Sequence, residues 1–122
     1  MRTPIVGVEW VVDAAGCDPA ALRDAAAIEA LLAAIVRELE LRIVGKLVHP
    51  FPSPGGVTAM FLLAESHLTC HTYPEHGVAT FNLACCRPRP EWPWSERLAE
   101  SFGATRVRVR RITRGGDEES TS

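Results

Sequence analysis

The stretch VTAMFLLAESHLTCHTYPEHGVATFNLACC (57–86) contains three apolar, strand-like runs one after another. Each is rich in the β-branched, aromatic and aliphatic residues that favour extended backbone, and the runs cover 57–65, 66–73 and 78–86. Pro74 and Gly77 predict a turn between the second and third runs, because proline fixes φ and glycine permits a positive φ. The first two runs meet at the Glu65–Ser66 bond, where no turn residue stands. We therefore expect a hairpin after Ser66 and a direct junction of two strands before it.

Upstream of this stretch the pattern predicts a strand, a helical region and a second strand. The strands are expected at 5–14 and 41–51, where Val, Ile and Leu predominate. Between them, an aspartate followed by proline at 18–19 suits the cap and first turn of a helix. The helical region should run to about Glu40, with a break near Asp24. Its apolar positions recur at steps of three and four, as in one buried helix face: Ile28, Leu31, Leu32, Ile35, Val36 and Leu39.

Downstream, a shorter helix is expected at 93–102, ended by Gly103. Alternating arginine and valine residues over 104–114 predict a last, half-exposed strand. The order β-α-β-β-β-β-α-β predicts an α+β fold, a two-layer α/β sandwich with helices on one face of a mainly antiparallel sheet. We expect one domain over 1–115 and a disordered polar tail at 116–122.

Length and charge limit the classes of function. The chain has 122 residues, enough for one core, and a formal net charge of −2, which gives no reason to expect nucleic acid or an acidic membrane as partner. The N-terminus lacks a signal-peptide pattern, and the apolar run at 25–36 is too short to span a bilayer. The expected location is therefore the cytoplasm. The four cysteines are expected to be reduced thiols there: Cys17, Cys70, Cys85 and Cys86.

Reactive side chains gather in AESHLTCHTYPEHG (64–77), which holds three of the four histidines. A zinc site is not favoured, because His67 and His71 share one face of a strand while Cys70 points to the other, and no C-x-x-C pair is present. A serine hydrolase would need a G-x-S-x-G elbow, which Ser66 lacks. Residue types alone favour a structural hairpin with polar side chains.

The segment ESHLTCHTYPEHG (65–77) resembles the block ESH-x-(S/T)-x-HTWPE-x-G of the small prokaryotic S-adenosylmethionine decarboxylases, which carry a pyruvoyl group. Cys86 lies at the family's distance after the serine. Other matching segments are GGVT (55–58), GCDPAALRD (16–24) and FGATRVRVRRITRG (102–115). The resemblance covers residues 5–115.

This resemblance implies a proenzyme that cleaves itself at the Glu65–Ser66 bond. The Ser66 hydroxyl attacks the Glu65 carbonyl to form an ester, and loss of a proton from the serine Cα expels the Glu65 carboxylate. Hydrolysis of the resulting dehydroalanine leaves a pyruvoyl group and ammonia, with a β chain of 1–65 and an α chain of 66–122. The pyruvoyl carbonyl forms a Schiff base with S-adenosylmethionine, whose decarboxylation supplies the aminopropyl donor for spermidine and other polyamines.

The resemblance also implies the roles of the side chains. His71 is the base for processing, Thr58 assists that step, and Cys86 returns a proton to the substrate carbon. Substrate contacts are implied for Glu75, Tyr73 and Phe51. A homodimer of cleaved protomers, with sites near the interface and no metal, is implied as well.

Some residues depart from the family pattern. Tyr73 replaces a tryptophan, the loop after Phe51 is one residue longer, and GVE (7–9) replaces GRH. The segment CCR (85–87) replaces Thr-Cys-Gly and adds a competing thiol, although spacing selects Cys86. Because these changes affect the nucleoside pocket, a pyruvoyl-dependent arginine or ornithine decarboxylase stays open. A dimeric binding module that never cleaves is the alternative from another class.

Overall fold

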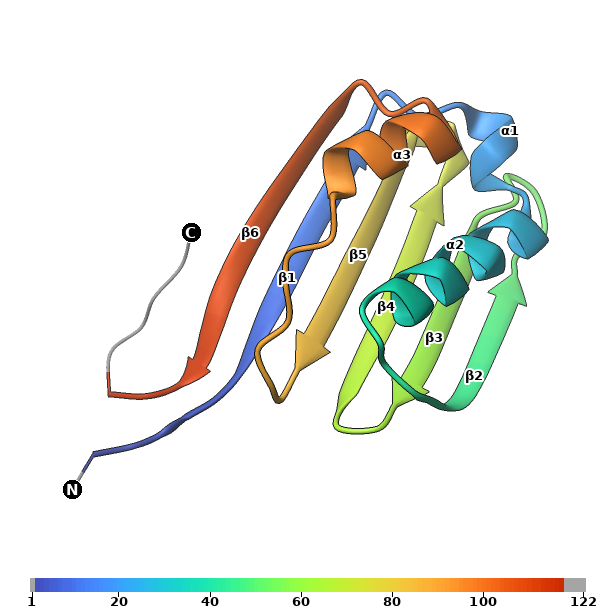
Figure 1. The fold of residues 1–122 in the computed structure, drawn as a ribbon. Helices are drawn as coiled ribbons and strands as arrows, with labels where there is room; N and C mark the ends of the chain where they lie inside the picture. Colours follow the sequence, from blue (N-terminus) through green and yellow to red (C-terminus); the bar gives the residue numbers. More distant parts are fainter. Residues whose placement is uncertain (1, 118–122) are drawn as a thin grey trace.

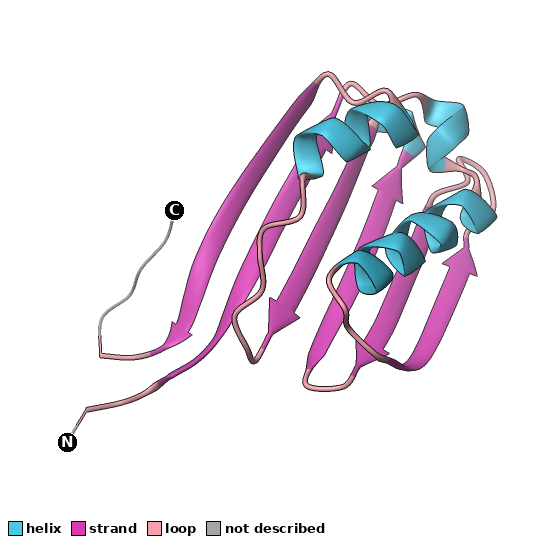
Figure 2. Cartoon of the chain, viewed as in Figure 1, coloured by secondary structure: helices cyan, strands magenta, loops and turns pink. Residues whose placement is uncertain are grey.

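The computed structural model describes residues 2–117, and it contains a six-stranded sheet with helices on one face (Figures 1 and 2). The strand order is β2-β3-β4-β5-β1-β6, and every neighbouring pair is antiparallel. The strands are β1 (Ile5–Ala15), β2 (Ile43–Pro50), β3 (Val57–Leu63), β4 (Ser66–Tyr73), β5 (Val78–Cys85) and β6 (Arg106–Gly115). The predicted two-layer α+β sandwich is confirmed.

Two of the helices begin at a capping aspartate, and a third ends at a glycine. They are α1 (Pro19–Leu22), α2 (Ala25–Glu38), the 3-10 turn η1 (Pro74–His76) and α3 (Trp94–Phe102). The Asp18 carboxylate accepts a hydrogen bond from the N–H of Ala20, and the Asp24 carboxylate accepts one from the N–H of Ala27. The predicted break near Asp24 is therefore the cap of a second helix. Gly103 ends α3 in the left-handed conformation, with φ 68°.

The core lies between the sheet and the helices. Alternate residues of the central strands face the helices and are buried, while their neighbours face the opposite, open side of the sheet. The largest fully buried side chains are Trp10, Trp94, Phe61, Phe102, Leu22, Ile28, Leu32, Ile35, Leu68, Leu83, Leu98 and Val12. Burial of these side chains is the main force that holds the helices on the sheet.

The junction between β3 and β4 corrects one prediction. Instead of two strands that run into each other, Ala64 and Glu65 form a two-residue turn, and Leu63 pairs with Ser66 across it. The turn places Glu65 at φ 67°, in the left-handed region. A residue with a Cβ pays roughly 1–2 kcal/mol in that conformation. The bond that the resemblance marks for cleavage thus follows a strained residue.

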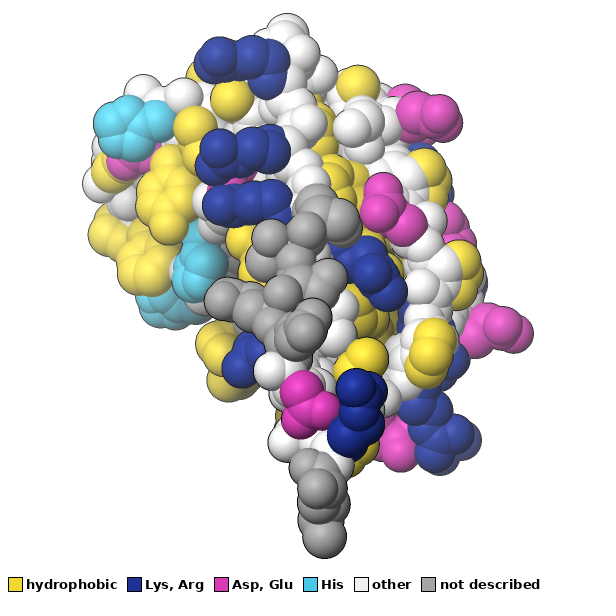
Figure 3. Space-filling view, turned by 90° about the vertical axis from the view of Figure 1, so that its left-hand side faces the viewer, with side chains coloured by type: hydrophobic (Ala, Val, Ile, Leu, Met, Phe, Trp, Pro, Cys, Tyr) yellow, Lys and Arg dark blue, Asp and Glu magenta, His cyan; other side chains and the backbone are white. Residues whose placement is uncertain are grey.

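The open face of the sheet has an apolar half and a charged half. Exposed apolar side chains on β2 and β3 include Leu47, Met60 and Leu62. On the edge strand β6, basic side chains stand in a row (Figure 3), and Arg108 and Arg110 each donate a hydrogen bond to Asp13 on β1, at 3.0 Å.

At the ends of the chain, the N–H of Gly116 donates to the carbonyl of Pro4, and Asp117 accepts from the N–H of Thr3. The rest of the tail predicted at 116–122 lies outside the described residues. Among the described residues, no helix is long and apolar enough to cross a membrane.

Candidate active site

The Glu65–Ser66 bond lies at one end of the sheet, in the turn between β3 and β4. Ser66 is the first residue of β4 and pairs with Leu63 on one side and Cys85 on the other. The carbonyl oxygen of Glu65 accepts a hydrogen bond of 3.1 Å from the backbone N–H of Cys86. This bond polarises the carbonyl and leaves a donor in place for any negative charge that develops on its oxygen.

The Ser66 hydroxyl is the second reactive feature of this turn. Its Oγ is buried and has no hydrogen-bond partner within the described residues. Buried polar atoms almost always have a partner, so an unpartnered one calls for an explanation. Here the hydroxyl is held next to the carbonyl of Glu65, with no hydrogen bond to break before it attacks. The fold thus positions both groups that would react in the implied cleavage, the Ser66 hydroxyl and the Glu65 carbonyl.

Two neighbouring cysteines stand beside this bond in different environments. Cys85 is buried on the helix-facing side, and burial raises the pKa of its thiol. Cys86 follows the end of β5 and is exposed. Both line a cavity of about 350 Å³ that also includes Glu65 and Ser66. Cys86 is thus the exposed member of the pair, and the choice of Cys86 as proton donor, made from spacing, stays a prediction.

A chain of polar side chains crosses four strands next to the same cavity. Arg114 pairs with the carboxylate of Glu9, and Asn82 donates a 2.9 Å hydrogen bond to that carboxylate. The Asn82 carbonyl oxygen lies 2.8 Å from Nε2 of His67, which must then carry a proton. The hydrogen bond from Asn82, together with Arg114, lowers the pKa of Glu9. Sequence reasoning missed this chain of contacts, although it noted Glu9 as a departure from the family.

Thr58 and His71 lie together on the open face of the sheet. They pair across β3 and β4, and Nδ1 of His71 lies 3.0 Å from Oγ1 of Thr58. However, His71 is five residues beyond Ser66 on the same strand, about 16 Å away at the usual rise of a strand. An odd separation also puts the two side chains on opposite faces. One protomer therefore does not bring His71 to Ser66.

The remaining predicted site residues lie at the same end of the sheet as His71. Tyr73 ends β4 and Glu75 lies in η1, and both are exposed. Phe51 follows β2 with its ring against His49, the ring centroids 4.5 Å apart. Because His49 pairs with Thr58 across β2 and β3, these aromatic rings flank the Thr58–His71 pair.

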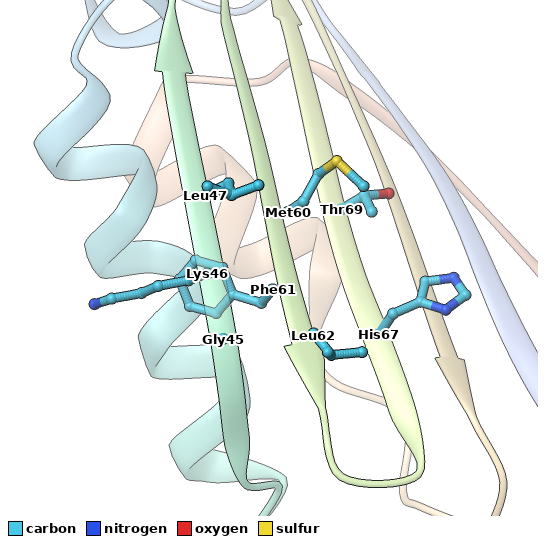
Figure 4. Close-up of a pocket in the computed structure, with 8 residues that line it drawn as sticks. All are labelled: Gly45, Lys46, Leu47, Met60, Phe61, Leu62, His67 and Thr69. Carbon is cyan, nitrogen blue, oxygen red and sulfur yellow. The ribbon is translucent and has the colours of Figure 1, made fainter.

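An apolar groove of about 630 Å³ lies on the open face, away from the Glu65–Ser66 bond. Figure 4 shows it across β2, β3 and β4, with Leu47 on β2, Met60 on β3, and Leu62 next to its cross-strand partner His67. It occupies the face between the Ser66 end and the His71 end. Within the described residues, no group of three or more His, Cys, Asp or Glu side chains is arranged to hold a metal ion.

Comparison with known proteins identifies the family of the chain. The family model described as S-adenosylmethionine decarboxylase matches residues 8–115. The chain belongs to this family. The match confirms the family resemblance predicted from 65–77. Enzymes with that name are carboxy-lyases.

Individual relatives extend over most of the chain. The S-adenosylmethionine decarboxylase proenzyme of Thermococcus gammatolerans is 32% identical over 115 residues, which are 93% of this chain and 80% of the relative. The proenzyme of Thermococcus kodakarensis is 33% identical over 116 residues, with the same shares of the two chains. The crystal structure of the adenosylmethionine decarboxylase from Aquifex aeolicus superposes with a TM-score of 0.77. It is 26% identical and covers 97% of this chain and 98% of that one.

Proposed function

We propose that this chain is a proenzyme that cleaves itself at Glu65–Ser66 and then decarboxylates S-adenosylmethionine, to supply the aminopropyl donor for polyamine synthesis. The observation that carries the proposal is the buried Ser66 hydroxyl, which has no hydrogen-bond partner among the described residues, beside a carbonyl whose oxygen accepts a 3.1 Å hydrogen bond from the N–H of Cys86. The relatives named proenzymes support it. The proposed location is the cytoplasm, and the proposed substrate is the small molecule S-adenosylmethionine.

Processing begins with attack of Ser66 Oγ on the Glu65 carbonyl carbon. The carbonyl oxygen gains negative charge, which the N–H of Cys86 stabilises. The left-handed conformation of Glu65, with φ 67°, raises the energy of the uncleaved turn, and cleavage releases it. After the ester forms, a base must remove the proton from the Ser66 Cα. We assign that base to His71, whose ring is oriented by Thr58.

Because one protomer separates His71 from Ser66, we propose that a homodimer completes the site. In a two-fold dimer each contact occurs twice, so the Thr58–His71 end of one open face can meet the Ser66–Cys86 end of its partner. The exposed apolar side chains of β2 and β3 favour such a contact, because burying them against the partner removes apolar surface from water. Two such sites would form, one at each end of the paired sheets.

The residues of the Ser66 end fit the pyruvoyl group that cleavage would produce. When formed from Ser66, this group acts as the electron sink for loss of carbon dioxide from an amino acid. The exposed thiol of Cys86, beside Ser66 in the cavity, then returns a proton to the substrate carbon. Phe51, Tyr73 and Glu75 lie at the His71 end, so the partner supplies the contacts to the adenosine.

Release of carbon dioxide from carboxyl-labelled substrates tests this function. Labelled S-adenosylmethionine, arginine and ornithine are each incubated with the purified protein, and Ser66→Ala serves as the inactive control. We expect release from S-adenosylmethionine alone. Release from arginine or ornithine instead would assign the chain to those substrates, and release by Ser66→Ala would contradict a mechanism that depends on Ser66.

A further inference from the structure

A small cavity lies beside the Glu65–Ser66 bond, near the loop that follows β5. Its lining residues are Leu41, Ala64, Glu65, Ser66, Cys85, Cys86, Arg87 and Arg89. Two polar atoms on this lining, Ser66 Oγ and Arg89 Nε, are buried and have no hydrogen-bond partner within residues 2–117. One can accept a hydrogen bond and the other can only donate. This cavity, of about 10 Å³, therefore brings an unsatisfied acceptor and an unsatisfied donor into one small space beside the Glu65–Ser66 bond.

The two arginines of this loop have different surroundings. Arg87 is bound to the side chain of Glu65, with Nε 3.0 Å from Oε2 and Nη2 3.1 Å from Oε1. Arg89 makes no ion pair with a described carboxylate, and its Nη1 donates only a long bond of 3.4 Å to the Pro88 carbonyl. Arg87 therefore stabilises the turn at Ala64 and Glu65 through the Glu65 side chain. The charge of Arg89 is not neutralised by a described carboxylate, so it can interact with an anion formed nearby.

The charge of Arg89 acts at the end of β5, where Cys85 pairs with Ser66. Burial raises the pKa of the Cys85 thiol, and the positive charge of Arg89 opposes that rise. Arg89, Ser66 and Cys85 line the same small cavity, so the guanidinium stands on the side of the turn where an anion formed at Ser66 would lie.

The elimination step of the proposed processing creates such an anion. A proton leaves the Ser66 Cα, and the electrons of that bond form the double bond between Cα and Cβ. The Cβ–Oγ bond breaks, and its electron pair stays on Oγ. That oxygen becomes part of the new α-carboxylate of Glu65, together with the carbonyl oxygen that Cys86 N–H holds. The negative charge thus appears partly on the atom that lacks a partner.

We infer that Arg89 is the binding residue for the Glu65 carboxylate that leaves Ser66 in the elimination step. This role rests on the proposed self-cleavage. The Nε–H of Arg89 supplies the hydrogen bond that Ser66 Oγ lacks in the precursor, and its charge favours departure of the carboxylate. Formation of the ester does not need Arg89, because the Cys86 N–H already serves the carbonyl oxygen. After cleavage, Arg89 keeps the new chain end in place.

A time course of processing separates these steps. Newly synthesised full-length chain is sampled, and mass spectrometry measures uncleaved precursor, mature chains and the ester, which hydroxylamine cleaves. The variants are Arg89→Gln and Arg89→Lys, with Arg37→Gln as a matched control on the exposed side of α2. Loss of a donor to a developing charge commonly slows a step by about a hundredfold, and we expect about tenfold at this partly exposed site.

The inference predicts that Arg89→Gln accumulates ester while precursor disappears at the normal rate. Arg89→Lys should retain most of the elimination rate, and Arg37→Gln should match the unaltered chain. Conversion of ester at the normal rate in Arg89→Gln overturns the inference. Equal slowing of both steps with a lower melting temperature overturns it too, because that result indicates a structural role. If the unaltered chain itself stays whole, the proposed self-cleavage fails first, and the inference fails with it.

Discussion

Two variants that are each unable to mature should rescue one another in a mixed dimer. His71→Ala removes the proposed base but leaves Ser66, whereas Ser66→Ala removes the nucleophile but leaves His71. Five residues of β4 separate the two positions, or about 16 Å, and a base must come within about 3 Å of the proton that it removes. No side-chain rotation closes that distance, so His71 can act at Ser66, as proposed, only from the other protomer.

The size of the rescue follows from pairing statistics. With equal co-expression and random association, about half of the His71→Ala chains have a Ser66→Ala partner in a two-fold dimer. About half of the His71→Ala chains should then mature into 1–65 and 66–122, whereas neither variant matures alone. Intact mass spectrometry distinguishes the two chains by their substitutions. As a control, His76→Ala changes an exposed histidine that has no proposed role, and this variant should mature when it is expressed alone. If co-expression yields no mature chain while the unaltered protein matures fully, a base supplied by the partner is refuted.

Two further predictions concern the cavity beside Ser66. Cys86→Ala should mature normally, because its backbone N–H is retained, but should decarboxylate about a hundredfold more slowly; an equal loss in Cys85→Ala would transfer the proton donor to the buried thiol. Glu9 has a lowered pKa in the folded protein, so its contribution to stability is present above its ordinary pKa and disappears as the pH falls through the lowered value. Glu9→Gln should therefore destabilise the chain in urea at neutral pH, and the loss of stability should shrink as the pH is lowered through the acidic range; a loss that is the same at every pH tested would show that the charge of Glu9 is not what matters.

Most of the fold could be predicted because its elements have local signals. Asp24 caps α2 and Gly103 ends α3 in the conformations that such residues favour. The turn at Ala64 and Glu65 could not be predicted in this way, since a glutamate at positive φ is unusual and leaves no local signature. Tertiary pairing of Leu63 with Ser66 imposes that conformation.

The candidate site was predictable only in part. The resemblance gave Thr58 and His71 roles in the same step, and the structure adds that their side chains are 3.0 Å apart. The distance from His71 to Ser66 follows from strand geometry that spacing alone did not reveal. The contact between Arg114 and Glu9 joins residues far apart in the chain and depends on the register of β1 and β6. Such registers are set by the packing of the whole sheet, so they are visible only in three dimensions.

The central claim is that the chain cuts itself at Glu65–Ser66, and the intact mass of the denatured protein tests it most directly. The account predicts two chains, 1–65 and 66–122, the second lighter by one ammonia than simple hydrolysis of the bond would leave it. The Ser66→Ala variant should remain whole. A single full-length chain from the unaltered protein, or a second chain with the mass of plain hydrolysis, would contradict a pyruvoyl enzyme.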